Sequence, residues 1–117
     1  MNKPRVIART SATPRTMNAT EAAYASLLTA RQRAGEVLSF SYESVSLRLG
    51  NDCRYTPDFF VVLANGEIEM HEVKGFMRDD AQTKLRTAAA QYPFRFILAL
   101  RVSRGKSISF DISVVPV

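Results

Sequence analysis

The chain contains little cysteine, no long apolar run and fewer acidic than basic residues. Its only cysteine, Cys53, excludes an internal disulfide and any cysteine-based zinc site, and we expect it to be an incidental free thiol in a loop. No stretch approaches the ~20 apolar residues of a membrane span, and the N-terminus lacks the apolar segment of a signal peptide. We therefore expect a cytoplasmic protein with no membrane partner.

The charge balance favours an anionic partner. The chain has 16 Lys and Arg residues against 11 Asp and Glu residues, which gives a formal net charge of +5. Such a surplus favours polyanions, although charge alone does not choose between nucleic acid and an anionic membrane. At 117 residues the chain has room for one domain with a single core.

Residues 1–17 differ in composition from the rest of the chain. They contain Lys3, Arg5, Arg9 and Arg15 but no acidic residue, and Pro4 and Pro14 interrupt them. We predict a basic flexible arm that either lies along phosphates or is a frayed terminus. A third possibility is that residues 5–8 add an edge strand to a partner subunit. Residues 18–117 form the predicted single domain.

The hydrophobic pattern predicts an α/β (α+β) fold. One helix is expected over 18–34, with capping-box spacing from Asn18 to Glu21, and another from Asp79 to the residue before Pro93. Strands are expected over 36–42, 46–49, 56–63, 67–74, 94–102 and 107–115. We summarise the expected order as α-β-β-β-α-β-β, with a central mixed sheet flanked by helices.

Two carboxylates and one lysine lie on a predicted hairpin. Asp58 belongs to the strand 56–63, and Glu72 and Lys74 belong to the strand 67–74. Carboxylates are ligands of Mg²⁺, which prefers hard oxygen atoms. A cation near a scissile phosphate orients the attacking water and offsets charge in the transition state. The three residues are therefore what metal-assisted phosphodiester cleavage requires.

The register of this hairpin decides whether the carboxylates can meet. With a two-residue Asn-Gly loop, Asp58 would pair with Val73, so Asp58 and Glu72 would point to opposite faces. With a three-residue loop, Ala64-Asn65-Gly66, and Gly66 in the left-handed region, Asp58 faces Glu72, and Lys74 lies on the same side. We predict the three-residue loop, which also collects Phe60, Val62, Ile68 and Met70 on the carboxylate face.

The segments Pro57-Asp58 and Glu72-Val73-Lys74, with Tyr55, Phe59 and Gly75 beside them, resemble the PD-(D/E)XK nuclease superfamily. In size and motif arrangement the chain is similar to its small phage-type junction-resolving endonucleases. The resemblance implies a restriction-endonuclease-like core, and a homodimeric endonuclease that hydrolyses branched DNA such as a Holliday junction. If the chain is phage-encoded, such an enzyme would act in the cytoplasm of the bacterial host.

The resemblance also implies roles for individual residues. Asp58, Glu72 and Lys74 would be catalytic. Asp58, Glu72 and the backbone carbonyl of Val73 would bind Mg²⁺, for which Mn²⁺ should substitute. Lys74 would position the attacking hydroxide, and cleavage would leave a 5′-phosphate and a 3′-hydroxyl.

Three acidic residues and one histidine have alternative interpretations. In several members of the superfamily an acidic residue on the first helix is a further metal ligand, and Glu21 has that position. The alternative is that Glu21 only completes the capping box, and the sequence leaves the two open. We expect Glu43 and Glu69 to be surface carboxylates, and His71 to be structural or exposed.

Candidate DNA contacts lie outside the motif. They are Lys84 and Arg86 on the second helix, Arg104 and Lys106 at the last hairpin, and Arg5, Arg9 and Arg15 in the arm; for each of these, solvent exposure without a ligand is the alternative. Other functions also stay open. The chain could be the nuclease component of a transposition, packaging or restriction complex, a non-catalytic DNA-binding module with a nuclease fold, or a basic RNA-binding or ribosome-associated protein.

Overall fold

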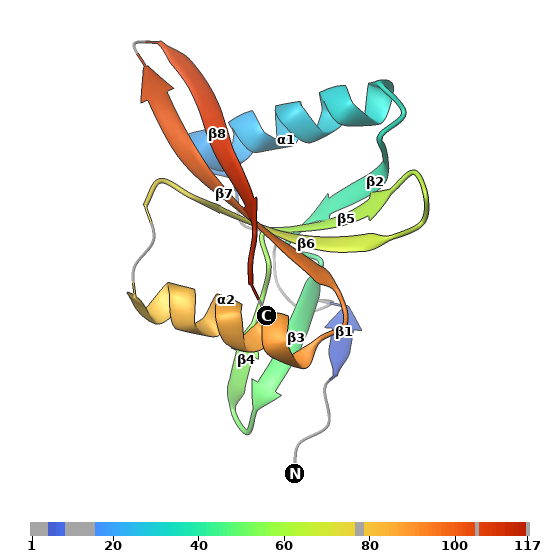
Figure 1. Cartoon of the computed structure of the whole chain (residues 1–117), viewed down its shortest axis with the longest axis vertical. Coiled ribbons are helices and arrows are strands. Elements are labelled where there is room, and N and C mark those ends of the chain that lie inside the picture. Colours follow the sequence, from blue (N-terminus) through green and yellow to red (C-terminus); the bar gives the residue numbers. More distant parts are fainter. Residues whose placement is uncertain (1–4, 9–15, 77–78, 105, 117) are drawn as a thin grey trace.

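The computed structural model describes residues 5–8, 16–76, 79–104 and 106–116. It is an α+β fold with a mixed sheet, as predicted (Figure 1). The elements are β1 (Val6–Ala8), α1 (Ala19–Arg33), β2 (Val37–Tyr42), β3 (Val45–Gly50), β4 (Cys53–Tyr55), β5 (Phe59–Leu63), β6 (Ile68–Lys74), α2 (Asp79–Gln91), β7 (Arg95–Arg104) and β8 (Ser107–Val114). The predicted order α-β-β-β-α-β-β has too few strands. It lacks β1 before α1, and it has three strands between the two helices where the structure has five, β2 to β6.

The main sheet has five strands in the order β2-β5-β6-β7-β8. Only β6 and β7 are parallel, and α2 is the crossover that connects them. The two helices lie on opposite sides of this sheet (Figure 1). Among the described residues, neither helix is both long and apolar enough to cross a membrane.

Each face of the main sheet has its own apolar core. On one face, Tyr24 and Leu28 of α1 pack with Phe59, Val61 and Val73. On the other face, α2 packs with Met70 and Phe96 through Leu85, Ala88 and Ala89. Because both faces are covered, β6 is buried on both sides along most of its length, and its polar side chains need partners within the protein.

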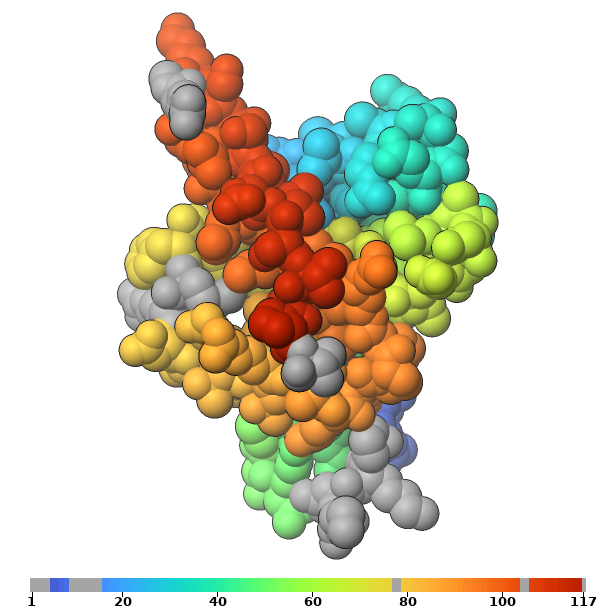
Figure 2. Space-filling view, viewed as in Figure 1, coloured from blue at the N-terminus to red at the C-terminus, as the bar shows by residue number. Residues whose placement is uncertain are grey.

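A second sheet consists of three short strands in the order β1-β3-β4. Two of them differ from expectation: Cys53 lies in a strand instead of a loop, and Val6–Ala8, inside the segment expected to be an arm, pairs with β3 of the same chain. Leu47 and Tyr55 attach this sheet to the core beneath α2. The small sheet therefore extends the molecule at the end remote from the β7–β8 tip, as the green atoms in Figure 2 show.

The β5–β6 hairpin has the predicted three-residue loop. Phe59 pairs with His71 and Phe60 with Met70, so continuing this register places Asp58 opposite Glu72. The Gly66 amide donates to the Leu63 carbonyl at 2.9 Å, and Gly66 has a φ of +89°. A residue with a side chain is strained at that angle, so the glycine sets the register on which the site depends.

Candidate metal centre

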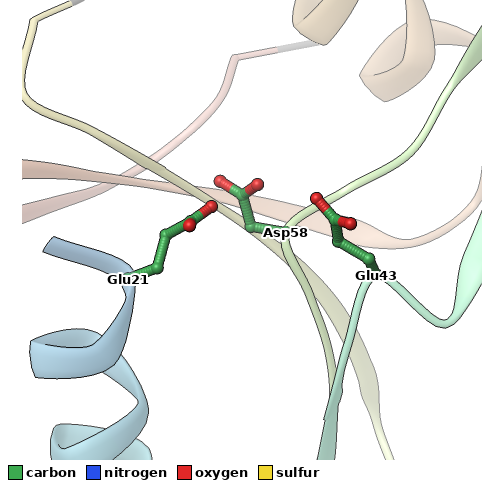
Figure 3. Close-up of side chains that lie close together, drawn as sticks. All are labelled: Glu21, Glu43 and Asp58. Atoms are coloured by element: carbon green, nitrogen blue, oxygen red, sulfur yellow. The ribbon is translucent and has the colours of Figure 1, made fainter. Parts of the chain in front are cut away.

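Three carboxylates from separate parts of the chain converge at one edge of the main sheet (Figure 3). Glu21 lies in the first turn of α1, Glu43 in the turn after β2, and Asp58 directly before β5. Each offers an oxygen atom, and these atoms all lie within 4.8 Å of one another. Glu21 and Asp58 are buried and Glu43 is half-buried.

Glu21 completes the capping box, and its carboxylate also belongs to the acidic cluster. Its carboxylate accepts a hydrogen bond from the Asn18 amide at 3.0 Å, and the Asn18 side chain accepts one from the Glu21 amide at 2.8 Å, which completes the capping box. The Tyr42 hydroxyl donates to the same carboxylate oxygen at 3.0 Å. These bonds hold the Glu21 carboxylate beside Asp58, so capping the helix and joining the acidic cluster are compatible.

Asp58 is fixed by the adjacent strand. Its Oδ2 accepts a hydrogen bond from the Val73 amide at 2.8 Å. Burial, together with the negative charges of Glu72 and Glu21, raises the pKa of Asp58 to about 7, against the opposing effects of the Val73 amide and Lys74. The three converging carboxylates offer only oxygen atoms as ligands, and together they carry a surplus of negative charge. Both properties suit a hard divalent cation.

Glu72 and Lys74 form a second part of the site, at the carboxyl end of β6. Lys74 Nζ lies 3.1 Å from Glu72 Oε2, while the Tyr55 hydroxyl donates to Glu72 Oε1 at 2.5 Å. Burial lowers the pKa of Lys74, but its ion pair with Glu72 and the charge of Asp58 outweigh that effect and raise it. Lys74 therefore stays protonated, and its side chain is 37% exposed.

The Tyr55 hydroxyl keeps its proton. Burial and the neighbouring Glu72 raise the pKa of Tyr55 well above its ordinary value, so the phenol donates to Glu72. Both oxygens of Glu72 are engaged, and Glu72 is outside the group of three converging carboxylates. It lies beside that group through its register position opposite Asp58. The role of Glu72 as a metal ligand stays a prediction.

Glu43 was expected to be a surface carboxylate, but it is half-buried and belongs to the acidic cluster. Its amide donates to the Asp58 carbonyl at 2.8 Å, and its φ of +48° turns the chain at the end of β2. The pairing of Tyr42 with Phe59 continues to Glu43 beside Asp58. A sequence argument that paired β2 with β5 would have found this residue.

The candidate DNA contacts are dispersed over the molecule. Lys84 is exposed and lies 3.4 Å from the Arg54 carbonyl, Arg86 borders a groove between α2 and β8, and Arg5 is exposed next to β1. Lys106 is exposed at the β7–β8 turn. Arg9, Arg15 and the side chain of Arg104 lie outside the described residues.

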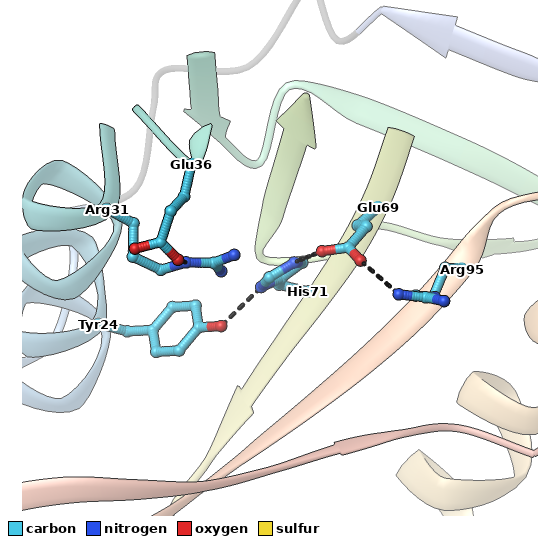
Figure 4. A network of polar contacts seen from close by, with 6 residues as sticks. All are labelled: Tyr24, Arg31, Glu36, Glu69, His71 and Arg95. Atoms are coloured by element: carbon cyan, nitrogen blue, oxygen red, sulfur yellow. Dashed lines mark hydrogen bonds and ion pairs between the residues drawn. The ribbon is translucent and has the colours of Figure 1, made fainter. Parts of the chain in front are cut away.

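A polar network connects α1 with the main sheet and ends at an exposed arginine, Arg95 (Figure 4). The Tyr24 hydroxyl and His71 Nδ1 are 2.6 Å apart, His71 Nε2 lies 2.9 Å from Glu69, and Glu69 lies 3.5 Å from Arg95. Glu69 is only 5% exposed, so expecting it at the surface was wrong. The hydrogen bond from His71 is the main cause of a lowered pKa at Glu69. His71 is buried and structural.

Comparison of the chain with protein-family models, with curated proteins and with solved structures finds no match. The geometry of the site and the motif are therefore the observations from which a function can be inferred.

Proposed function

We propose that this protein is a Mg²⁺-dependent DNA endonuclease of the PD-(D/E)XK type that hydrolyses phosphodiester bonds, with branched DNA as its preferred substrate. The observation that carries the proposal is the convergence of Glu21, Glu43 and Asp58 within 4.8 Å, next to a protonated lysine on the adjacent strand. Structural acidic clusters do not require such a lysine, whereas phosphate hydrolysis uses both a cation site and a positive side chain.

In this proposal one group of residues binds the cation and Lys74 contacts the substrate. Asp58, Glu43 and Glu21 would hold the cation, and the Val73 carbonyl stays a predicted ligand. Bound Mg²⁺ would polarise a phosphate oxygen and lower the pKa of a coordinated water. Glu72 holds Lys74 at 3.1 Å, with its other oxygen fixed by Tyr55. Lys74 thus presents its ammonium group toward the solvent-facing side, where a phosphate could approach.

The proposed reaction is hydrolysis of a phosphodiester bond by water. The water oxygen forms a bond to phosphorus, and the bond from phosphorus to the 3′ oxygen breaks. The 3′ oxygen keeps the electron pair and takes up a proton, while the water loses one. In this assignment Lys74 orients the water and offsets the charge that develops on the phosphate.

We extend the proposal to a homodimer, because cutting both strands of a junction uses two sites. β8 is the last strand of the main sheet in the described structure, and its Ile108 and Ile112 are 38% and 47% exposed. Long exposed apolar edge strands tend to pair with another chain. A second copy fits because antiparallel pairing of two β8 strands about Phe110 sets Ile108 of one copy opposite Ile112 of the other.

A groove of about 480 Å³ adjoins this edge. It lies between α1 and β8 and is lined by apolar side chains that include Leu27, Ile108 and Ile112. The same second copy would cover these residues.

The test is cleavage of a supercoiled plasmid and of a four-way junction, each with Mg²⁺ and with EDTA. Lys74→Met removes the ammonium group and keeps the length of the side chain, so cleavage should be lost while metal binding and thermal stability persist. Arg33→Met removes an exposed charge at the end of α1 and should cut normally. Cleavage that persists in EDTA, or a Lys74→Met variant that cuts at the wild-type rate, would sink the proposal.

A further inference from the structure

The small sheet carries three arginines in a line across its strands. Arg48 of β3 is paired directly with Arg54 of β4. On the other side of β3, the Arg48 amide donates to the Arg5 carbonyl at 3.0 Å, in line with the β1–β3 register. We call Arg5, Arg48 and Arg54 the arginine row. With strands ~4.8 Å apart, the row spans about 10 Å.

The arginine row faces away from α2. The neighbouring cross-strand pair, Leu47 and Tyr55, is buried in the core beneath α2. Successive side chains alternate between the faces of a strand, so the row lies on the opposite face. Arg5 and Arg54 are exposed, and Arg48 is half-buried and donates to the Asn51 side chain at 3.0 Å.

Like charges directly opposite each other destabilise an antiparallel pair. The arginine row thus collects three positive charges on one face of a short sheet. A ligand with several negative charges at regular spacing removes the repulsion and uses all three side chains. One nucleic-acid strand carries a phosphate about every 3.4 Å along a duplex axis, so about three phosphates match the length of the row.

The backbone beneath the row is held in place. The Tyr92 hydroxyl lies 2.7 Å from the Arg5 amide, 2.8 Å from the Arg5 carbonyl and 2.7 Å from the Arg48 carbonyl. Tyr92 is only 5% exposed and belongs to the core beneath α2. The backbone of two members of the row is thus positioned before any ligand binds, which lowers the entropy lost on binding.

The row is also connected to the metal centre by a short stretch of chain. Arg54 is in β4, and only Tyr55, Thr56 and Pro57 separate it from Asp58. At ~3.3 Å per extended residue, four steps cover about 13 Å, which is about four phosphate steps of one strand. The same strand could therefore contact both places.

We propose that the arginine row is a phosphate-binding ridge that holds the backbone of a nucleic acid beside the metal centre. The choice of nucleic acid rests on the proposed nuclease function. Contacts of this kind position the backbone without reading base sequence. The row therefore contributes affinity and orientation, and it gives no sequence preference.

The experiment measures binding of a fluorescent duplex and of a four-way junction by anisotropy, in EDTA and over a series of salt concentrations. Arg48→Thr/Arg54→Thr should weaken binding at ~0.1 M salt by about tenfold or more, and should lower the salt slope by about 2. Threonine favours strands, so the sheet should persist. Arg54→Thr alone should lower the slope by about 1, whereas the charge-matched control Arg33→Gln should leave affinity and slope unchanged.

Stability provides a second measurement. Because the double substitution relieves repulsion but also removes the hydrogen bond from Arg48 to Asn51, its melting temperature at low salt should stay close to that of the wild type. Wild-type affinity and slope in the double variant would overturn the ridge, as would an equal loss in the Arg33→Gln control. Binding to phosphatidylserine vesicles is measured with the same variants. If the double variant loses vesicle binding and keeps wild-type DNA binding, the assignment of the row to nucleic acid is overturned.

The ridge and the nuclease can fail separately. A row-dependent loss of DNA binding in a protein that never cleaves DNA would support the ridge and reject the nuclease. Metal-dependent cleavage with wild-type DNA binding in the double variant would do the reverse.

Discussion

The amide of Glu43 donates a hydrogen bond to the carbonyl of Asp58 at 2.8 Å. This bond continues the β2–β5 ladder past the end of both strands and holds two carboxylates side by side. The left-handed backbone of Glu43, with a φ of +48°, turns the chain at the same point. Glu43 and Asp58 are thus fixed to each other at the end of the sheet, and Glu21 joins them from the first turn of α1.

Glu43→Gln tests whether that carboxylate binds the cation. The change keeps the size of the side chain and removes one negative charge, so the affinity for Mn²⁺ should fall by about tenfold or more, as measured by calorimetry. Cleavage should partly recover at high metal concentration. Glu67→Gln, which changes an exposed glutamate beside the β5–β6 turn, is the matched control and should bind as the wild type does. Unchanged affinity in Glu43→Gln would remove Glu43 from the ligand set.

Asp58→Asn should stabilise the metal-free fold at alkaline pH. The folded pKa of Asp58, about 7, lies above the ordinary value of 3.8, so the folded state favours the neutral acid. Its contribution to stability is complete below the unfolded pKa and is lost as the pH rises through the folded pKa. Asparagine removes this loss, which is on the order of a few kcal/mol, and its side-chain oxygen still accepts from the Val73 amide.

Thermal unfolding in EDTA between about pH 5 and pH 8 checks this. The wild type should lose stability over that range, and Asp58→Asn should lose less. Adding Mg²⁺ at the upper pH should raise the melting temperature of the wild type, because it binds the folded state, and should leave the variant unaffected. A variant that is less stable than the wild type at every pH would contradict the raised pKa of Asp58.

His71→Leu should destabilise the fold by about 3 kcal/mol, because it leaves the Tyr24 hydroxyl and the buried Glu69 carboxylate without their shared partner. Urea unfolding measures the change. In the His71→Leu background, Tyr24→Phe should cost less stability than the same change costs in the wild type. The reason is that the Tyr24 hydroxyl has already lost its partner in that background. Strictly additive effects would show that the two side chains act independently.

Ile112→Lys should convert a dimer into a monomer. A charge at the centre of an apolar edge opposes strand pairing between copies, and sedimentation velocity would detect the change. Ser107→Lys places the same charge on the same strand but on the opposite face, and it should remain dimeric. If the wild type is a monomer at concentrations where it cuts DNA, β8 is not the contact.

The local features of this fold could be predicted from the sequence. The hairpin register follows from Gly66 and from the requirement that Asp58 and Glu72 share a face, and the structure has that register. The start of α1 follows from Asn18 and Glu21 in the same way. In each case the residues that determine the geometry are close to one another in the chain.

The features that could not be predicted depend on contacts between distant segments. Glu43 joins Asp58 only because β2 pairs with β5 across the two intervening strands of the small sheet. Glu69 is buried because partners from β6 and β7 meet around it. Alternation within a single strand carries no information about these neighbours, and a buried charged residue looks like a solvent-facing one.

The capping box gives the first turn of α1 a direct connection to the charge in the site. The Glu21 oxygen that accepts the Asn18 amide belongs to the same carboxylate that faces Asp58. A cation that draws the Glu21 carboxylate away would compete with its hydrogen bond from the Asn18 amide. A cation that leaves the carboxylate in place would screen its repulsion from the other two carboxylates of the cluster. Hydrogen exchange at the Asn18 amide would therefore report occupancy of the centre, even in a variant that no longer cuts DNA.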